Sequence, residues 1–362
     1  MTRSAARLSL TLVLALLAAA CGGGEGGAGG DSTAVASSGT RLTGAGATFP
    51  NPIYQKWADA YNKQTGVQIN YQSIGSGGGI RQFTDGTVDF GATDGPMTDE
   101  QIAAAGGNVA HIPTVLGAVV LTYNLPALGD ASLVLDGPTI ADIFLGRITR
   151  WNDSRLAALN PGVALPDADL VVVHRSDGSG TTYVFTDYLS KVSADWKSTA
   201  GANTAVNWPT GLGGKGNEGV TQQVKQLPGA LGYVEMVYAV SNGLKFAAVR
   251  NSAGNAVTPS LASVTEAAGS AALTAGTDFR VSITNPPGPG AYPIASFTWL
   301  LVKQDAANPA TAALIRNFLS WMVTPEAQQM AQDLQYAPLP EAVAALVRDR
   351  IATLRAGGQP IP

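Results

Sequence analysis

The sequence is poor in the side chains that form disulfides and metal sites. Of its 362 residues, one is cysteine and two are histidine, His111 and His174. A single cysteine leaves no internal disulfide, and neither histidine has a carboxylate or a second histidine at metal-ligand spacing. We therefore expect no metal site and no cofactor. Only 13% of the residues are charged and 45% are hydrophobic, a composition that buries a large core and excludes a disordered chain.

Basic charge is also scarce. The chain has 22 basic and 26 acidic residues, and two of the basic ones, Arg3 and Arg7, lie in the leader described next. The remainder has 20 basic and 26 acidic residues and a net charge of −6. A nucleic-acid-binding protein needs a basic surface, so we exclude that class. An anionic ligand would have to be held by a few local donors.

The first forty residues are predicted to lie outside the fold. Residues 1–20 combine a basic start with an apolar run too short to span a bilayer, as in a secretory signal peptide. The segment Leu17-Ala-Ala-Ala-Cys21 resembles a bacterial lipobox, with Ala18 where the motif prefers leucine. The alternative is a chance cysteine at the signal boundary. We favour a lipidated Cys21, because residues 21–40 have the composition of a flexible tether. The protein would then be extracytoplasmic, anchored by lipid to the periplasmic side of the cell membrane.

Beyond residue 41 the sequence predicts an α/β fold. Short apolar strands alternate with helical stretches, which is typical of mainly parallel sheets. Ile53, Trp57 and Tyr61 lie four residues apart and predict one face of a helix over 52–64, followed by Gly66 as its end. The expected strands include 67–72, 87–92, 117–123, 170–173 and 297–302.

Three glycine-rich segments each connect an expected strand to an expected helix. They are Gly44–Pro50, Ser73–Gly79 and Arg175–Thr181. Each contains a serine or threonine hydroxyl, and a helix start adds free N–H donors and the positive end of the helix dipole. Any one of them is more simply a turn with a helix cap. Three in one chain favour a shared oxyanion site.

Arg175 is the cation expected at such a site. Its planar guanidinium suits phosphate-type oxygens. Asp177 could hold the guanidinium in place or could cap the following helix. The alternative for Arg175 is a surface arginine on a loop.

Enzymatic alternatives have weaker support. Ser76 and Ser179 lie in glycine-rich turns, but neither turn matches the Gly-x-Ser-x-Gly pattern of a nucleophile elbow. His174 could act as a base for Ser179, yet no residue is identified that would orient it. Residues 211–216 match Gly-x-Gly-x-x-Gly without a preceding apolar strand, so we interpret them as a loop and not as a nucleotide site. We predict a binding protein and not an enzyme, with no catalytic residues.

The three segments together resemble one family, the phosphate-binding protein of the Pst-type ABC importer. The resemblance runs from Leu42 to about the end of the chain. It also includes four further motifs in the same order, namely 88–94 (VDFGATD), 143–146 (IFLG), 212–217 (LGGKGN) and 227–233 (LPGALGY).

The resemblance implies a set of phosphate ligands. The first segment would supply the Thr48 side chain and the Phe49 N–H, and Asp177 would pair with Arg175. Thr93 stands where we expect serine. The full set implied is Thr48, Phe49, Ser76, Asp94, Arg175, Ser179, Gly180 through its N–H, and Thr181.

The resemblance also implies the architecture and the partners. The family has a periplasmic-binding-protein fold of type II-like character, with two α/β domains, a ligand cleft and a hinge of two crossovers. Here this implies a first domain of 41–115 plus 292–362 and a second of 116–291, with the proline- and glycine-rich stretch 285–290 near the return crossing. The implied partners are inorganic phosphate and the permease subunits of the importer, and the implied state is a monomer.

Asp94 would decide which anion binds. Phosphate at neutral pH keeps a proton that a carboxylate can accept, whereas sulfate keeps none. The alternative is a binding protein for another oxyanion, such as sulfate or molybdate, and a carboxylate ligand argues against it.

Overall fold

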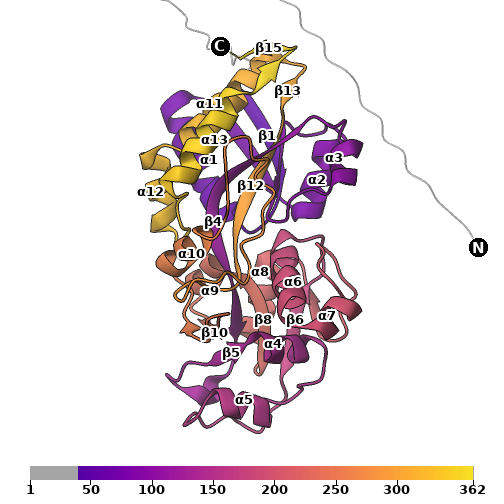
Figure 1. Cartoon of the computed structure of the whole chain (residues 1–362), viewed down its shortest axis with the longest axis vertical. Coiled ribbons are helices and arrows are strands. Elements are labelled where there is room, and N and C mark those ends of the chain that lie inside the picture. The colour runs from indigo at the N-terminus through magenta and orange to yellow at the C-terminus, as the bar shows by residue number, and fades with distance from the viewer. Residues whose placement is uncertain (1–39, 362) are drawn as a thin grey trace, which may run out of the picture. The chain divides into compact units, whose positions relative to one another are not determined.

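The computed structural model describes residues 40–361. The predicted signal peptide (1–20), Cys21 and the predicted tether up to residue 39 lie outside the described residues. The described part confirms an α/β protein built on one large sheet and two small ones (Figure 1). None of the helices between residues 40 and 361 has the length and apolar character needed to cross a membrane.

The large sheet has nine strands and is mixed. Its strands follow one another in the order β2 (Gln68–Ser73), β1 (Arg41–Gly46), β3 (Phe90–Thr93), β12 (Ala295–Lys303), β4 (Val109–Tyr123), β8 (Ala230–Glu235), β6 (Val171–Arg175) and β7 (Leu212–Gly214), and β9 (Lys245–Phe246) pairs with β4. The pairs at either end are parallel, but β12 and β8 both lie antiparallel to β4. The prediction of mainly parallel sheets is therefore wrong at the centre, where the outgoing and returning segments run in opposite directions.

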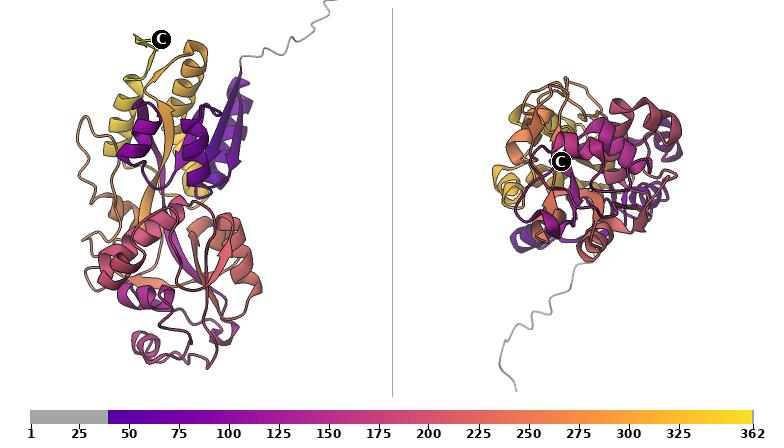
Figure 2. Two further views of the ribbon diagram at one scale, coloured as in Figure 1. Left: turned by 90° about the vertical axis from the view of Figure 1, so that its right-hand side faces the viewer. Right: turned by 90° about the horizontal axis from the view of Figure 1, so that it is seen from below.

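Strand β4 is shared by both halves of this sheet. Residues 109–118 pair with β12, and residues 119–123 pair with β8. All 15 residues of β4 are buried, as expected for a strand at the centre of a sheet that is covered on both faces. Figure 1 shows β4 passing from the β1–β3 half to the β6–β8 half, with β12 beside its upper part, and Figure 2 shows the two halves from the side.

Helices cover each half of the sheet. Around β1–β3 lie α1 (Asn51–Thr65), α2 (Ser76–Thr84), α3 (Asp99–Ala104), α11 (Pro309–Met322), α12 (Pro325–Asp333) and α13 (Glu341–Ala352). The other half carries α4 (Gly137–Phe144), α5 (Ser154–Leu159), α6 (Gly180–Val192), α7 (Ala194–Thr199), α8 (Gly216–Gln226) and α9 (Met236–Ser241), and α10 (Leu261–Ala268) packs against β4 and β12.

Short elements complete the described chain. One small sheet joins β5 (Val134–Asp136), β10 (Ala248–Arg250) and β11 (Ala256–Val257), and the other joins β13 (Asp305–Ala306), β14 (Arg355–Ala356) and β15 (Gln359–Pro360). A 3-10 turn, η1, covers Pro126–Leu128.

Helix α1 follows its sequence pattern closely. Ile53, Trp57 and Tyr61 are buried on one face, and Gly66 ends the helix with the left-handed φ of 76° that glycine adopts without strain. The indole N–H of Trp57 donates to the carbonyl of Ala327 in α12 at 2.8 Å. The first helix of the fold is therefore held against the C-terminal helices, so residues from both ends of the chain form one layer.

Candidate functional site

The structure brings the three predicted segments together. Each follows the carboxyl end of a strand, where parallel strands of an open sheet present their loops to a common crevice. The Gly180 N–H donates to the Ser76 hydroxyl at 3.0 Å, and the Gly77 N–H donates to the carbonyl of Gly178 at 2.9 Å. The second and third segments are therefore in direct contact.

Ser76 lies at the centre of this contact and is fully buried. Its Oγ accepts from the Gly180 N–H at 3.0 Å and from the Asp94 N–H at 3.4 Å. A hydroxyl has two acceptor positions and one proton. With both acceptor positions used, the Ser76 hydroxyl is left as a donor.

Asp94 is the carboxylate of the site, at the end of β3. Its Oδ1 accepts from the Thr298 hydroxyl at 2.8 Å. Its Oδ2 is buried and has no hydrogen-bond partner among residues 40–361. Burial raises the pKa of Asp94 to about 7, although the hydrogen bond from Thr298 and the charge of Arg175 both lower it.

The approach of Gly180 to Asp94 requires a glycine. A Cβ at position 180 would lie 2.5 Å from the Asp94 Oδ2 and 2.5 Å from the Ser76 Oγ. No side chain fits there, so only a glycine lets the backbone of residue 180 approach the Ser76 Oγ and the Asp94 carboxylate this closely. Gly180 is also the first residue of α6, where N–H groups are free of intrahelical partners.

Arg175 ends β6 and is 3% exposed. Its Nε and Nη2 donate to the two oxygens of Asp177 at 2.8 and 2.5 Å, and its Nη1 donates to the Thr181 hydroxyl at 3.3 Å. Burial raises the pKa of Asp177, but the hydrogen bonds and charge of Arg175 outweigh it and hold that pKa below its usual value. A buried guanidinium held by a bidentate partner keeps a fixed orientation.

Ser179 acts as the cap of α6. Its side chain accepts from the Thr182 N–H at 3.0 Å, and the residue is fully buried. Ser179 is therefore a helix cap, which is the simpler of the two interpretations considered from the sequence. The hydroxyl proton remains available to a ligand, so capping and binding are compatible.

The loop Ala47–Phe49 is held by three tyrosines that were not predicted. The hydroxyls of Tyr71, Tyr238 and Tyr336 donate to the carbonyls of Ala47, Thr48 and Phe49 at 2.6, 2.5 and 2.6 Å. All three tyrosines are buried. Because three consecutive carbonyls are tied down, the backbone orientation of the loop, and hence of its N–H groups, is fixed.

Residues 211–216 differ from their interpretation as a loop. Leu212–Gly214 form β7, which pairs with β6, and α8 starts at Gly216. Two of the three residues of β7 are glycine, so the sequence gives no apolar pattern that would predict a strand. The segment is a strand because it pairs with β6. This is a fourth strand-to-helix junction, and it brings Asn217 into the site.

Sequence reasoning missed Asn217, Thr298 and Glu235 as members of the site. Asn217 donates to the Thr48 hydroxyl from its backbone N at 3.1 Å and from Nδ2 at 2.7 Å. Glu235 is fully buried and accepts from the Val237 N–H at 2.7 Å, and burial raises its pKa well above the usual value. Asn217 lay in a motif noticed in the sequence, but no local pattern marks Thr298 or Glu235.

Comparison with known proteins gives the family. A family model described as a PBP superfamily domain matches residues 31–326. The phosphate-binding protein PstS of Xylella fastidiosa is 44% identical over 308 residues, covering 85% of this chain and 84% of that one. The PstS protein of Pasteurella multocida is 45% identical over 310 residues, covering 86% and 89%. This chain belongs to the PstS phosphate-binding protein family.

Solved structures show the same fold. The crystal structure of a phosphate-binding protein from Stenotrophomonas maltophilia superposes with a TM-score of 0.68 at 20% identity, covering 86% of this chain and 93% of that one. The periplasmic-binding-protein fold expected from the sequence is therefore confirmed. Within the PstS family fold, the segments described above lie at the loops that end the strands of both sheet halves.

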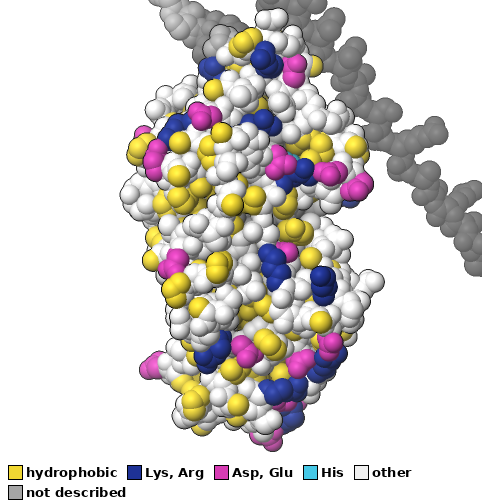
Figure 3. Space-filling model, viewed as in Figure 1, with side chains coloured by type: hydrophobic (Ala, Val, Ile, Leu, Met, Phe, Trp, Pro, Cys, Tyr) yellow, Lys and Arg dark blue, Asp and Glu magenta, His cyan; other side chains and the backbone are white. Residues whose placement is uncertain are grey.

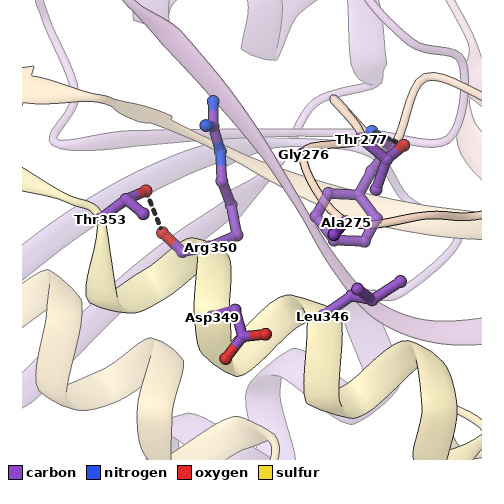
Figure 4. A pocket seen from close by; sticks show the side chains of 8 residues that line it. Ala275, Gly276, Thr277, Leu346, Asp349, Arg350 and Thr353 are labelled. Carbon is purple, nitrogen blue, oxygen red and sulfur yellow. Dashed lines mark hydrogen bonds between the residues drawn. The ribbon is translucent and has the colours of Figure 1, made fainter.

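A further pocket lies between the loop 275–279 and helix α13 (Figure 4). The predicted ligands are not among the residues that line it. The Thr353 hydroxyl donates to the backbone carbonyl of Arg350 at 2.7 Å. Figure 4 shows the side chains of Arg350 and Asp349 pointing in different directions from α13, so their charges do not converge on one point.

Proposed function

We propose that this member of the PstS family binds inorganic phosphate outside the cytoplasmic membrane and delivers it to the permease subunits of an ABC importer. The names of its relatives, phosphate-binding protein PstS, support this proposal. The observation that carries it is the buried carboxylate of Asp94. Its Oδ2 has no hydrogen-bond partner among the described residues and lies beside Gly180 and close to Ser76, whose hydroxyl is left as a donor.

The chemistry of phosphate fits one acceptor among many donors. Phosphate at neutral pH carries a proton, which Asp94 accepts in a short, charge-assisted O–H···O bond. Its other oxygens accept from hydroxyl and N–H groups. Sulfate or molybdate, without a proton, would place a lone pair against the carboxylate. An unpaired buried group of this kind can support discrimination of roughly 10⁴–10⁵, so binding of another oxyanion remains the less supported alternative.

The proposed ligands supply donors from both sides of the crevice. Arg175 offers its guanidinium, held in place by Asp177. The hydroxyls and backbone N–H groups surround the remaining oxygens. The proposed set is Thr48, Phe49, Ser76, Asp94, Arg175, Ser179, Gly180 and Thr181.

Local donors, and not net charge, would capture the anion. The chain is acidic, and on the face seen in Figure 3 basic side chains lie among acidic and neutral ones. A few oriented donors in a buried site interact more strongly than the same groups in water. This is consistent with a loop held in advance by Tyr71 and Tyr336 and a guanidinium held by Asp177.

We also propose the domain division and the hinge. One domain would comprise 41–115 with 292–362 and the other 116–291, so that β4 and the return segment before β12 form the two crossings. Hydrogen bonds from Gly180 to Ser76 and from Asn217 to Thr48 would then join the two domains across the crevice. Domain closure about a hinge would form these bonds.

Lipid anchoring at Cys21, a location on the periplasmic side of the cell membrane and a monomeric state belong to the same proposal. The supporting features are the lipobox-like sequence and the glycine-rich segment that follows it. A protein tethered in this way would stay near the importer that it serves.

Calorimetry tests the proposal. The mature chain carrying Cys21→Ser is titrated with phosphate, sulfate and molybdate at one ionic strength. We expect phosphate to bind roughly 10⁴-fold more tightly than the others, the lower end of the range that an unpaired buried group supports. Equal binding of sulfate, or no binding of phosphate, would overturn it. A generic phosphoester offered to the same sample is expected to show no turnover.

A further inference from the structure

We infer that Asn217 is a positioning residue, which fixes the hydroxyl protons of Thr48 and Thr181 so that both can only be donated to the ligand. The inference rests on the proposed binding of phosphate. It adds a residue that does not touch the ligand and acts through two that do.

Asn217 is fully buried at the start of α8. Its backbone N–H and its Nδ2 donate to the Thr48 Oγ1 at 3.1 and 2.7 Å. Its Nδ2 also donates to the Thr181 Oγ1 at 3.2 Å. One side-chain amide therefore contacts hydroxyls from the first and the third glycine-rich segments.

The direction of these bonds is set by Glu235. The Glu235 backbone N–H donates to the Asn217 Oδ1 at 2.9 Å. A backbone N–H can only donate, so the amide oxygen of Asn217 must face Glu235. The Nδ2 then faces the two threonines, because turning the amide over would lose the bond from Glu235 and set two N–H donors against each other.

The hydroxyl of Thr48 has no acceptor position left. Both are taken by the backbone N–H and the Nδ2 of Asn217. Thr181 is in the same situation, since its Oγ1 accepts from Asn217 Nδ2 and from Arg175 Nη1 at 3.3 Å. Each hydroxyl keeps its single proton for another partner. For an oxyanion, which offers only lone pairs on most of its oxygens, two hydroxyls locked as donors are the suitable arrangement.

Asn217 also joins segments far apart in the chain. It follows Thr48 by 169 residues and Thr181 by 36. In the domain division proposed above, Thr48 and Asn217 lie on opposite sides of the crevice. Asn217 would then reach the Thr48 hydroxyl only when the two domains close. Closure would therefore orient the proton of that hydroxyl toward the ligand.

The test compares two substitutions of Asn217 in two backgrounds. Asn217→Asp keeps the acceptor for the Glu235 N–H but replaces the Nδ2 donor by an acceptor, to which the threonine hydroxyls would turn their protons. Asn217→Ala removes the side chain without adding charge. Phosphate affinity is measured for each substitution in the natural background and in Thr48→Val/Thr181→Val, where the hydroxyls are absent.

We expect Asn217→Ala to weaken phosphate binding by roughly 10- to 100-fold in the natural background, the equivalent of one or two hydrogen bonds. In the valine background the same change should cost less than about threefold, since the groups through which Asn217 acts are missing. Equal costs in the two backgrounds would show a merely structural role and overturn the inference. If the alanine protein does not fold, the aspartate variant is compared in the same two backgrounds. The loss of phosphate affinity that arises through the threonine hydroxyls should be absent in the valine background, whereas the loss caused by the added charge should remain.

A matched control is Asn160, a buried asparagine that follows α5 and lies outside the site and the proposed crossings. Its Nδ2 donates to the carbonyls of Val134 and Leu156, both at 2.9 Å, and its Oδ1 accepts from the Val134 N–H at 2.8 Å. Asn160→Asp should lower thermal stability and leave phosphate affinity unchanged.

The proposed function and the role of Asn217 can be contradicted separately. If the natural protein does not bind phosphate, the proposed function is wrong, whereas tight binding that is insensitive to Asn217 contradicts only this inference.

Discussion

The hydroxyl of Thr298 donates to Oδ1 of Asp94 at 2.8 Å, across 204 residues of sequence. Thr298 lies in β12, the neighbour of β3, and Asp94 directly follows β3. The shorter bond of the Thr298 hydroxyl goes to Oδ1, and a longer one goes to the Thr93 carbonyl at 3.4 Å, so Oδ2 is the carboxylate oxygen left for a ligand. The carboxylate is thereby held in one orientation as an acceptor, and this makes Asp94 the residue to test for anion selectivity.

Asp94→Asn should lose selectivity more than phosphate affinity. An asparagine can offer its carbonyl to the phosphate proton or its NH₂ to a bare oxygen, and it removes a negative charge beside an anion. Sulfate binding should rise, because the unpaired carboxylate that excludes it is gone. The measurement is competition between phosphate and sulfate in the two proteins at one ionic strength. An unchanged ratio would mean that selectivity arises elsewhere.

Arg175→Ala should weaken phosphate binding far more than Arg175→Lys, with the fold retained in both. Lysine keeps the charge but loses the planar fork that meets Asp177 and an oxyanion together. Loss of a charged hydrogen bond corresponds to roughly a tenfold or greater fall in affinity. Arg150, an exposed arginine paired with Asp167 and Asp169, gives the control Arg150→Ala, which should bind normally. An Arg175→Ala protein within about twofold of the natural affinity, well below the worth of a charged hydrogen bond, would exclude Arg175 as a ligand.

The stability of the phosphate-free protein should depend on pH through Asp94. Burial raises the pKa of this group to about 7 in the folded protein, whereas an aspartate in an unfolded chain titrates near pH ~4. Between these values unfolding releases a proton, so the free energy of unfolding falls as pH rises. From pH 5 to 8 the natural protein should lose roughly 1–3 kcal/mol relative to Asp94→Asn, at about 1.4 kcal/mol per pKa unit.

Urea unfolding of both proteins at several pH values measures this difference. Glu235, whose pKa burial also raises, is present in both proteins and contributes to both curves. Parallel curves for the two proteins would show that Asp94 is not protonated in the folded, phosphate-free state.

Cys21→Ser should release the protein from the membrane and leave phosphate binding intact. The cysteine lies before the glycine-rich segment and outside the described fold. Membrane and soluble fractions are separated, and phosphate affinity is measured on the released protein. A variant that stays with the membrane would contradict the lipid anchor.

Local sequence patterns were enough to predict helix α1 and the glycine-rich segments of the site. The face of α1 and its end at Gly66 follow from apolar spacing and from the left-handed conformation of glycine. The glycine-rich segments around Ser76 and Ser179 were visible because each carries its turn residues and its hydroxyl within a few positions. From the sequence alone, contact between the two segments was only a hypothesis. The hydrogen bond from the Gly180 N–H to the Ser76 hydroxyl shows that they are in contact.

What the sequence did not reveal depends on contacts between distant segments. Tyr336 reaches the carbonyl of Phe49 across 287 residues, and no local pattern predicts a hydroxyl meeting a particular carbonyl. Strand β4 was expected only from residue 117, because His111, Pro113 and Thr114 interrupt the apolar run. The structure buries them all the same, with the His111 ring accepting from the Met97 N–H at 3.1 Å and Thr114 bonded to Tyr54 at 2.8 Å.

The sharing of β4 between β12 and β8 has a consequence for hydrogen exchange. Its residues 109–118 are bonded into one half of the sheet and 119–123 into the other. If one half of the sheet opened, it would expose its part of β4. The other part of β4 would then lose the support of the strand on which it continues. The backbone amides of β4 should therefore exchange with deuterium at the slow rate set by opening of the whole molecule. The strand that connects the two halves would then be the most protected segment of the chain.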